Sequence, residues 1–395
     1  LRRKRPVGLR LDGNGEPVFP TKPGAWSADL DDDGKILWLL DEVRELDRSE
    51  DRTYTATSLY RQAMLARSRF GMDRVHAYAN TYWMGNRFPL QEELKQFQPW
   101  TLDDGETLVL AGGRIRRVQL PPQWDVQQLL RVVAGDQART EVAPQAQYAI
   151  GLYFQSRQQY LEALVEYAAL RERWADSPWA GHAATQVERI RQPQVHLNQT
   201  GVQLADEPAK LQVTYRNTSK IHFVARKIDL EGYLRELRDQ DFHVSKGPRD
   251  LWALQNWSYW FTQRHDPNQY AYQIAVRHVG KEIVRWADVV EADGTHRYAE
   301  TILQTPLDRH GAYLVQAFLE APPEGEPDKL ADRMLAGDSR AVVVLNDIAV
   351  VEKTAKGGRL HFVADARTGA PIADASVEIV EFWSDWRQKE RKSYH

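Results

Sequence analysis

The chain has 395 residues, of which 42% are hydrophobic and 27% charged, an ordinary globular balance that fits about two to four domains. Its formal net charge of −3 excludes a general electrostatic attraction to nucleic acid or to anionic lipid. It contains no cysteine, which excludes disulfides, thiolate metal sites and a cysteine nucleophile.

The ends of the chain carry no recognisable targeting segment. No apolar run approaches the ~20 residues needed to span a bilayer. The basic stretch Arg2–Arg5 is not followed by the apolar region of a signal peptide. Because the chain begins at Leu1 rather than Met and ends at His395 shortly after a predicted strand, we expect an internal fragment of a longer protein.

Residues 1–33 are polar and rich in Gly, Pro and Asp, so we expect them to be extended or poorly ordered. Asp29, Asp31 and Asp33, followed by a glycine, spell D-x-D-x-D-G, the opening of an EF-hand calcium loop. The twelfth position is Leu40, where that loop needs a bidentate glutamate. The main interpretation is therefore a solvated acidic turn that caps the next helix, and the weaker alternative is a calcium site built from these three carboxylates.

Residues 34–191 are predicted to form a helical region. Apolar residues at helical spacing predict helices over 35–47, 53–70, 74–83 and 88–100, the last of them ended by Pro99. Two strand-like runs that meet at Gly112 and Gly113 predict a short β-hairpin near 106–120 inside this region. Helices then resume over 125–190.

The clearest helical hairpin pairs residues 144–157 with 160–174. Small and aromatic residues lie there at the spacing of a tetratricopeptide repeat, namely Gly151, Phe154, Ala163 and Tyr167. The usual tryptophan of that repeat is replaced by Gln147, so we expect a short helical solenoid with one good repeat. Two roles remain open for it: docking of a protein partner, or packing as a spacer.

From residue 194 onward the sequence is strand-like. Alternating apolar residues or β-rich composition predict strands at 195–197, 210–215, 220–227, 273–276, 282–290, 298–303 and 312–319. Leu230, Leu234 and Leu237 have helical spacing and predict a helix between strands. Residues 321–339 are rich in Pro, Gly, Glu and Asp and predict an exposed loop. Three further β-rich runs follow at 341–345, 359–365 and 376–382, with turns before the second and third.

The amino-acid sequence of these last runs resembles that of the bacterial alpha-2-macroglobulin family. Four parts of its "D..TG.P...A.V" signature match here, namely Asp365, Thr368–Gly369, Pro371 and Ala375. Upstream, the segment 311–315 is similar to the "G-x-Y-x-V" strand that closes the preceding domain of that family. The resemblance covers roughly residues 194–383.

This resemblance implies a multidomain α + β chain, in which a tetratricopeptide-like helical region precedes antiparallel β-sandwich domains. It implies a first macroglobulin-like β-sandwich over 194–340, and a linking strand with the truncated start of a second over 341–395. The implied function is that of a non-enzymatic scaffold in a bacterial protease trap. Such a protein is extracytoplasmic, acts in cell-envelope defence, has proteases as partners and needs no cofactor.

No catalytic residue is predicted. The eleven histidines show no H-E-x-x-H or other paired ligand spacing, and there is no G-x-S-x-G elbow or phosphate-binding glycine loop. His222, His278 and His361 lie in strand-like runs, and we expect them to be solvent-facing strand residues. The alternative function is a binding scaffold for a protein or glycan partner, motivated by the repeat and by the tryptophan-rich segment 252–286. Exposed tryptophans there would favour binding, and buried ones a plain scaffold. An enzyme with an unrecognised site is the third hypothesis.

Overall fold

The structure, a computed structural model, describes residues 8–79, 82–83, 86–87, 96–136, 138–239, 256–263, 270–325, 327, 329–355, 358–377, 381–385 and 390–394. Contacts between residues divide the chain into two compact units, with the break between Gln192 and Pro193. The combination of helices with several small sheets confirms the α + β class. No described helix is both long enough and apolar enough to cross a membrane.

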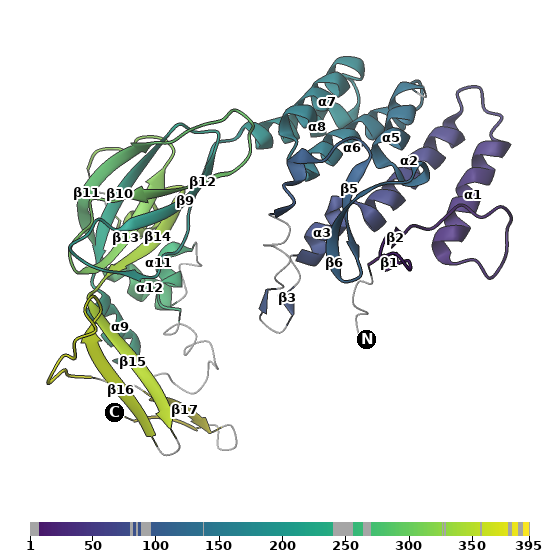
Figure 1. Cartoon of the computed structure of the whole chain (residues 1–395). Helices are drawn as coiled ribbons and strands as arrows, with labels where there is room; N and C mark the ends of the chain where they lie inside the picture. Colours follow the sequence, from purple (N-terminus) through teal and green to yellow (C-terminus); the bar gives the residue numbers. More distant parts are fainter. Residues whose placement is uncertain are drawn as a thin grey trace. The chain divides into compact units, whose positions relative to one another are not determined.

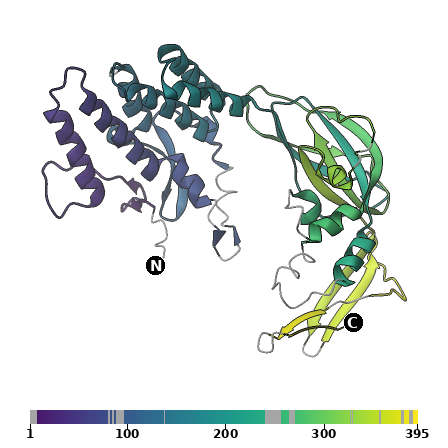
Figure 2. The same cartoon turned by 180° about the vertical axis from the view of Figure 1, so that it is seen from behind.

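The first unit is a row of helices in which neighbours in the sequence pack on one another (Figures 1 and 2). The helices are α1 (Asp32–Leu46), α2 (Thr53–Phe70), α3 (Met72–Ala79), α5 (Val126–Gly135), α6 (Ala143–Ser156), α7 (Tyr160–Arg173) and α8 (Pro178–Arg191). Helix α1 packs on α2, α2 on α5, and α5 to α8 each on the next. Tetratricopeptide-like packing of this row stays a prediction.

Short strands accompany the helices of the first unit. They are β1 (Arg10–Leu11), β2 (Pro17–Val18), β3 (Tyr82–Trp83), β4 (Asn86–Arg87), β5 (Glu106–Ala111) and β6 (Arg114–Gln119). Strands β5 and β6 form a hairpin whose turn residues, Gly112 and Gly113, both have positive φ. Leu9 forms a bridge with Ala111, so the extended N-terminal segment runs beside this hairpin.

The core of the first unit is made by facing sides of the helices and the hairpin. Trp124 is fully buried in it and donates a hydrogen bond from Nε1 to the carbonyl of Pro20 at 2.7 Å. Ile150, Leu170 and Ile190 bring α6, α7 and α8 into the same core. One continuous apolar cluster therefore joins α1, α2 and α5 to α8, while Met72 and Val75 of α3 lie in a separate cluster with Leu108.

One predicted helix of the first unit needs correction, and a second falls mostly outside the described residues. The helix predicted at 74–83 ends at Ala79, and residues 82–83 pair as strand β3 with β4. The helix predicted at 88–100 lies mostly outside the described residues. In its described part Gln96 is helical, and Pro99 begins a 3₁₀ turn over Pro99–Thr101, which agrees with the tolerance of proline at a first helical position.

The second unit contains two sheets that share a core. The larger has the order β11-β10-β13-β14-β8 and the smaller the order β12-β9-β7. The strands are β7 (Gln194–Leu197), β8 (Val202–Gln203), β9 (Lys210–Arg216), β10 (Lys220–Ile228), β11 (Val279–Val289), β12 (Ala299–Gln304), β13 (Gly311–Phe318) and β14 (Ser339–Leu345). All pairings are antiparallel except the short contact of β8 with β14.

Side-chain alternation places both faces of the larger sheet in apolar surroundings. Phe223, Val315 and Val343 point toward the smaller sheet and pack with Leu211 and Val213 of β9. The intervening residues Ile228, Leu314 and Val342 face the opposite side, since successive side chains of a strand alternate. Among the described residues, four short helices cover that side: α9 (Leu230–Asp239), α11 (Tyr259–Thr262), α12 (Tyr270–Arg277) and α13 (Leu330–Leu335).

Two predictions in the second unit are wrong. Residues 273–276, predicted as a strand, lie in helix α12, where Tyr272, Ile274 and Ala275 are buried against other helices. Residues 321–339, predicted as an exposed loop, contain α13, and its Met334 is fully buried. In both cases tertiary packing overrides local composition.

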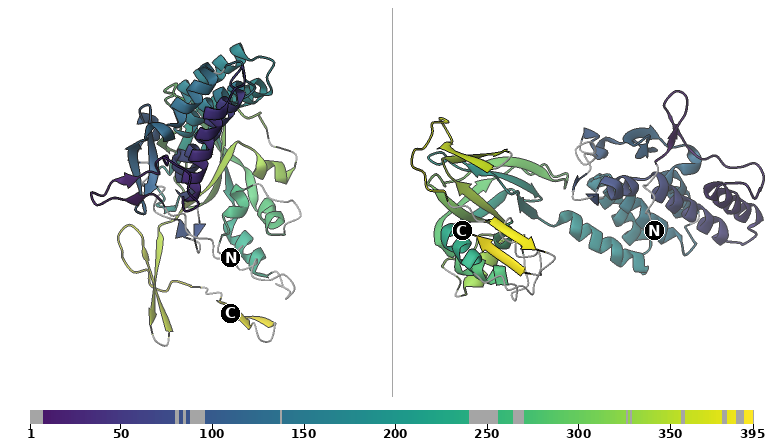
Figure 3. Two further views of the ribbon diagram at one scale, coloured as in Figure 1. Left: turned by 90° about the vertical axis from the view of Figure 1, so that its right-hand side faces the viewer. Right: turned by 90° about the horizontal axis from the view of Figure 1, so that it is seen from below.

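The C-terminal segment forms two separate strand pairs, β15 (Ile348–Ala355) with β16 (Gly358–Asp365) and β17 (Glu381–Asp385) with β18 (Glu390–Tyr394). Figure 3 shows the first pair as a two-stranded ribbon. Large apolar side chains are exposed on it, including Val350, Val351, Leu360 and Phe362. The strand predicted at 376–382 falls partly outside the described residues, and β17 begins at Glu381.

Candidate functional site

The acidic segment before α1 forms a helix cap. Asp31 is the N-cap residue of α1, and its Oδ1 accepts a hydrogen bond from the Gly34 amide at 2.7 Å. Asp33 pairs with Arg69 at 3.1 Å, and Asp29 forms a turn with Ser27 through its own amide. Within the described residues, no group of three His, Asp or Glu side chains is arranged to hold a metal ion. The structure shows the predicted cap, while the calcium site stays a prediction.

The segment Asp365–Pro371 is a tightly bonded turn. Oδ1 of Asp365 accepts hydrogen bonds from the amides of Arg367 and Thr368, at 3.0 and 2.8 Å, and from the Thr368 hydroxyl at 2.8 Å. The bond from the Thr368 amide is the main reason why the pKa of Asp365 is lowered. Gly369 has φ +71°, in the left-handed region that favours glycine. Asp365, Thr368 and Gly369 thus each have a geometric role in the turn.

The side chain of Arg367 connects this turn to other segments of the second unit. Its guanidinium lies 3.1 Å from Glu207 Oε1 and 3.5 Å from Asp347 Oδ1, and it donates to the carbonyl of Ala205. Asp347 lies between β14 and β15, accepts the Ala205 amide at 2.9 Å and lies 3.0 Å from His310 Nε2. Asp347 therefore joins three segments at the point where the chain leaves the larger sheet.

In the segment 311–315 as well, each residue of the sequence pattern has a defined structural role. Gly311 has φ +145°, a conformation in which a side chain would be strained. The buried Tyr313 donates its hydroxyl to the carbonyl of Arg309 at 2.8 Å, which fixes the loop before β13. Val315 is fully buried between the two sheets. The G-x-Y-x-V pattern thus combines a turn, a loop anchor and a core residue.

Gly151 allows α6 and α7 to approach closely. An added Cβ at this position would lie 2.3 Å from Cε1 of Tyr167. Tyr167 is fully buried, and its hydroxyl donates to Gln155 Oε1 at 2.9 Å, so the ring has little room to move. Burial also raises the pKa of the Tyr167 phenol.

Gln147, at the position where the repeat usually has tryptophan, makes polar contacts between three helices. Its amide donates to Glu166 Oε2 at 2.6 Å, and the same carboxylate pairs with Arg131 at 2.9 Å. The three residues lie on α6, α7 and α5. A buried amide with an ionised acceptor thus replaces an apolar contact here.

An aromatic group lies partly exposed on α6 and α8. Tyr148 is 5.2 Å from Trp179 between ring centroids, and Trp179 is 5.4 Å from His182. Gln186 donates to the Tyr148 hydroxyl at 3.3 Å and holds the ring in place. Aromatic rings that combine apolar area with polar edges are typical of contact surfaces. Sequence analysis did not single out these rings, because they come from two separate helices.

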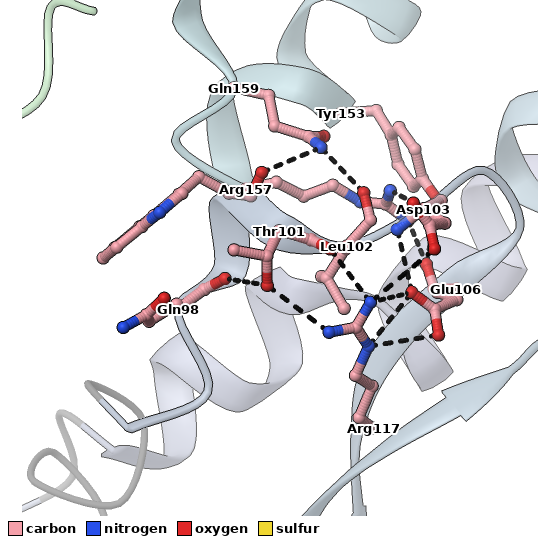
Figure 4. A network of polar contacts seen from close by, with 10 residues as sticks. Gln98, Thr101, Leu102, Asp103, Glu106, Arg117, Tyr153, Arg157 and Gln159 are labelled. Carbon is pink, nitrogen blue, oxygen red and sulfur yellow. Dashed lines mark hydrogen bonds and ion pairs between the residues drawn. The ribbon is translucent and has the colours of Figure 1, made fainter.

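A polar network around Arg157 joins α6 to the segment before β5 (Figure 4). Arg157 is fully buried, lies 3.9 Å from the ring centroid of Tyr153, and donates to the carbonyls of Asp103 and Glu106. Burial lowers the pKa of Arg157 to about 10. The guanidinium is thus held by backbone carbonyls and a tyrosine ring, which makes its role structural.

The exposed side of the same network is an ion pair. Arg117 Nε lies 3.1 and 3.0 Å from the two carboxylate oxygens of Glu106, and Nη2 donates to the carbonyl of Thr101 at 2.9 Å. The hydrogen bond from Arg117 holds the pKa of Glu106 below its usual range. Gln159 completes the contacts by donating to the carbonyl of Leu102 at 2.8 Å.

A cleft of about 950 Å³ opens at one end of the larger sheet of the second unit. Its walls include Leu230 and Leu234 of α9 and Val344 of β14, with Lys227 and His310 also in the lining. Clefts of this size with apolar walls are typical of binding sites. The described lining includes the ionisable residues Asp229, Glu231 and His278 but no serine, threonine or cysteine.

His278 fastens α9 to the sheet at this cleft. Its Nδ1 lies 3.3 Å from Asp229 Oδ2 and its Nε2 lies 2.8 Å from Glu236 Oε2. The Gly232 amide, and then the His278 ring, lower the pKa of Asp229, while Arg277 is the first cause of the lowered pKa of Glu236. The prediction that His278 is a solvent-facing strand residue is therefore wrong, because it ends the turn before β11 and contacts two carboxylates.

The described tryptophans of the segment 252–286 are largely packed. Trp260 is buried among α9, α11 and α12, and Trp286 stacks on Phe223 with ring centroids 5.0 Å apart. Trp257 lies partly buried against the same helices, and Trp252 lies outside the described residues. By the criterion set from the sequence, this segment favours scaffold over binding surface.

No protein-family model and no curated protein matches the chain. Among solved structures, the chain is similar to native alpha-2-macroglobulin from Escherichia coli spanning domains MG0-NIE-MG1, with 12% identity, TM-score 0.28, and coverage of 46% of this chain and 48% of that one. A fragment of the same protein spanning NIE-MG1 gives 14% identity, TM-score 0.26, and coverage of 46% and 74%. A Salmonella alpha-2-macroglobulin mutant gives 9% identity, TM-score 0.25, and coverage of 44% and 8%. The chain thus spans about half of the first of these structures.

Proposed function

We propose that this chain is a non-enzymatic scaffold segment of a bacterial alpha-2-macroglobulin-like protease trap. The observation that carries the proposal is the pair of signature segments, 311–315 and 365–371, each of which has a defined structural role. The first begins β13, the central strand of the larger sheet, and the second anchors the outgoing ribbon through Arg367 and Asp347. Residues that link one domain to the next need such anchoring, since a linker sets the placement of the modules it joins.

The ribbon β15–β16 supports the further proposal that residues 341–395 hold a linking strand and, after it, the start of a second macroglobulin-like domain. An isolated two-stranded hairpin is marginally stable in water, and three or more strands with an apolar face are needed. Val351 and Phe362 are directly paired and exposed on one face, and Val350 is exposed on the other. In the proposed trap this ribbon pairs with further strands and buries both faces. The first such domain corresponds to residues 194–340.

In the proposed trap, the parent protein is extracytoplasmic, its partners are proteases, and these residues perform no catalysis. The test incubates the full-length parent with an active serine protease and assays that protease on a large protein and on a small chromogenic peptide. Loss of activity on the large substrate alone supports steric enclosure. Unchanged activity on both substrates contradicts the proposal that the parent protein traps that protease. The 395-residue chain alone serves as control and is expected to change neither activity.

A second candidate function is a scaffold that binds a protein or glycan partner through the helical region. The observation that favours it is the partly exposed aromatic group of Tyr148, Trp179 and His182. Peptide and glycan arrays probed with the intact chain test it. A ligand lost in the double variant Tyr148→Ala/Trp179→Ala, but kept in Tyr54→Ala, supports this function, because Tyr54 is an exposed aromatic residue elsewhere. Absence of any ligand counts against it.

A further inference from the structure

A cavity of about 370 Å³ lies in the first unit, where the N-terminal strands meet three helices. Its walls come from β1 and β2, the beginning of α1, the end of α2 and the beginning of α3. Three arginines lie in this lining, namely Arg10 of β1, Arg69 of α2 and Arg74 of α3. Because like charges repel, the convergence of three guanidinium groups on one cavity is unfavourable unless negative charge compensates for it.

Two aspartates in the same lining compensate for only part of this charge. Asp33 pairs with Arg69, with Asp33 Oδ1 and Arg69 Nη2 3.1 Å apart. Asp31 is already bound as the N-cap of α1, where its Oδ1 accepts the Gly34 amide at 2.7 Å. Within the part of the chain that the structure describes, the side chains of Arg10 and Arg74 form no ion pair or hydrogen bond. The lining therefore has one positive charge in excess, which favours an anion over a cation.

The fold of the N-terminal segment directs Arg10 toward this cavity rather than into the core. Its neighbours Leu9 and Leu11 both pack against the core of the first unit. Since successive side chains of an extended segment alternate, Arg10 points away from that core. It is directly paired with Val18 of β2, which is also exposed. Arg10 and Val18 thus lie on the same side of the strand pair and both line the cavity.

Apolar side chains complete the lining. Phe19 and Phe70 meet edge to face with ring centroids 5.2 Å apart, and Leu110 is buried. Cavities that combine apolar walls with a few charged groups are typical of small-molecule sites, and this volume lies at the lower end of their range of about 300–1,000 Å³. A ligand that fits this lining has an apolar body as well as an anionic group.

We propose that this cavity binds a monocarboxylate attached to a small apolar group. Guanidinium groups bind carboxylates through paired N–H donors, and Arg10 and Arg74 have these donors free for a ligand. A single negative charge neutralises the excess charge of the lining, whereas a phosphate dianion would leave negative charge beside the two aspartates. The carboxylate belongs either to a free organic acid or to the C-terminal residue of a protein chain. The proposal is independent of the protease-trap function.

Saturation-transfer NMR of the intact chain with two matched ligands tests the proposal. N-acetyl-L-phenylalanine has a carboxylate beside an aromatic group, and N-acetyl-L-phenylalaninamide has the same body without the charge. The acid is expected to bind with a Kd on the order of 0.1–1 mM. The amide is expected to bind at least about tenfold more weakly, since it cannot form charge-assisted hydrogen bonds with the arginines. Equal binding of acid and amide, or no binding of the acid up to about 10 mM, overturns the proposal.

Two further ligands identify the source of the carboxylate and check its chemistry. The acid 3-phenylpropionate has the same aromatic group and carboxylate but no peptide group. If it binds as tightly as N-acetyl-L-phenylalanine, the cavity takes free organic acids, and if it binds much more weakly, the cavity takes a chain terminus. Binding of inorganic phosphate without binding of either acid contradicts the proposed ligand class.

Substitution of the arginines tests whether binding occurs in this cavity. Arg74→Gln is expected to weaken the binding of N-acetyl-L-phenylalanine by at least about tenfold, and the more exposed Arg10→Gln by a smaller factor. The matched control is Arg61→Gln, which removes the same charge from an exposed position of α2 outside the lining. This control is expected to bind like the unmodified chain, and circular dichroism checks that every variant keeps its helices. If folded Arg74→Gln and Arg61→Gln chains have the same affinity, the cavity is not the binding site.

Discussion

At the scale of single residues, Gly151 is the position where α6 approaches the buried ring of Tyr167 on α7. We expect Gly151→Ala to lower the free energy of unfolding by about 1–2 kcal/mol. Overpacking a core costs about 1–3 kcal/mol, because the new methyl group meets the buried ring of Tyr167. The better helix propensity of alanine offsets up to about 1 kcal/mol of this cost. Denaturant unfolding followed by tryptophan fluorescence measures the difference.

The chain offers a matched control for this substitution. Gly181 is exposed in α8, and an added Cβ there meets nothing within 4 Å. Gly181→Ala is therefore expected to stabilise the protein by about 0.5–1 kcal/mol through helix propensity alone. If both substitutions changed stability by the same amount and sign, close packing at Gly151 would not explain the effect.

Asp47 is a second residue whose role is local and measurable. It ends α1 and is buried, and its carboxylate accepts bonds from the hydroxyl and amide of Ser49 and of Thr55. Thr55 lies in the first turn of α2, where the N-cap Arg52 supplies no side-chain bond. Asp47 therefore caps α2 from outside that helix. These bonds, first among them the one from the Ser49 hydroxyl, hold the pKa of Asp47 well below its usual range.

The lowered pKa of Asp47 predicts an acid-dependent loss of stability. The contribution is complete above the unfolded-state pKa of about 4 and is lost as the pH falls toward the folded-state pKa. Asp47→Asn should lower the unfolding midpoint at pH 7 and reduce the further loss between about pH 5 and pH 2. Denaturant titrations over this range measure both effects. Asp176→Asn, at an exposed position before α8, should leave the pH profile unchanged.

At the scale of elements, the sequence predicts those parts whose pattern and environment agree. The alternation of Leu211, Val213 and Tyr215 predicts a strand, and β9 buries these three side chains in the core between the sheets. The spacing of Leu230, Leu234 and Leu237 predicts a helix, and α9 occupies that segment. In both cases one local period is enough to define the buried face.

Helices α12 and α13 could not be predicted in this way, because distant residues stabilise them. Ile274, Ala275 and Val276 form a short apolar run that suits a strand equally well. Helix α13 has six residues, and groups from β13 and β14 satisfy the carbonyls at its C-terminal end. The local sequence pattern of α13 does not indicate hydrogen-bond donors that come from other strands.

Gln316 provides the test of how α13 is held. From β13 its amide donates to the carbonyl of Arg333 at 2.6 Å and of Ala336 at 3.1 Å, while its Oε1 accepts Arg226 Nε at 3.0 Å. Gln316→Leu is expected to cost about 1–3 kcal/mol of unfolding free energy, since buried carbonyls lose their donor. Hydrogen exchange should show faster exchange of the α13 amides. Gln212→Leu, at an exposed position of β9, should change neither quantity.

The candidate sites also fall into two groups, those that local sequence predicts and those that depend on residues far apart in the chain. The turn at Asp365 is readable from sequence because its bonds connect residues within six positions of each other. The network of Arg157 with Glu106 and the cleft beside His278 combine residues tens of positions apart. Single-sequence reasoning offers no signal for such combinations, and for His278 it indicated an ordinary surface residue. The aromatic group of Tyr148 and Trp179 was missed for the same reason.

At the scale of the whole molecule, the cores follow the division of the chain at residue 192. The core around Trp124 and Tyr167 lies within the first unit, and the cores on both faces of the larger sheet lie within the second. A core that belongs to one unit gains its free energy from that unit's own burial. Cooperativity is therefore expected within each unit rather than across the chain.

This arrangement predicts two unfolding transitions in calorimetry of the intact chain. Gly151→Ala should lower the midpoint of one transition and Gln316→Leu that of the other, since each substitution acts on the core of a different unit. A 1 kcal/mol change corresponds to a shift of about 2–4 °C for units of this size. Hydrogen exchange during heating assigns each transition to its unit. A single transition that both substitutions lower would instead mean that the two units unfold as one cooperative body.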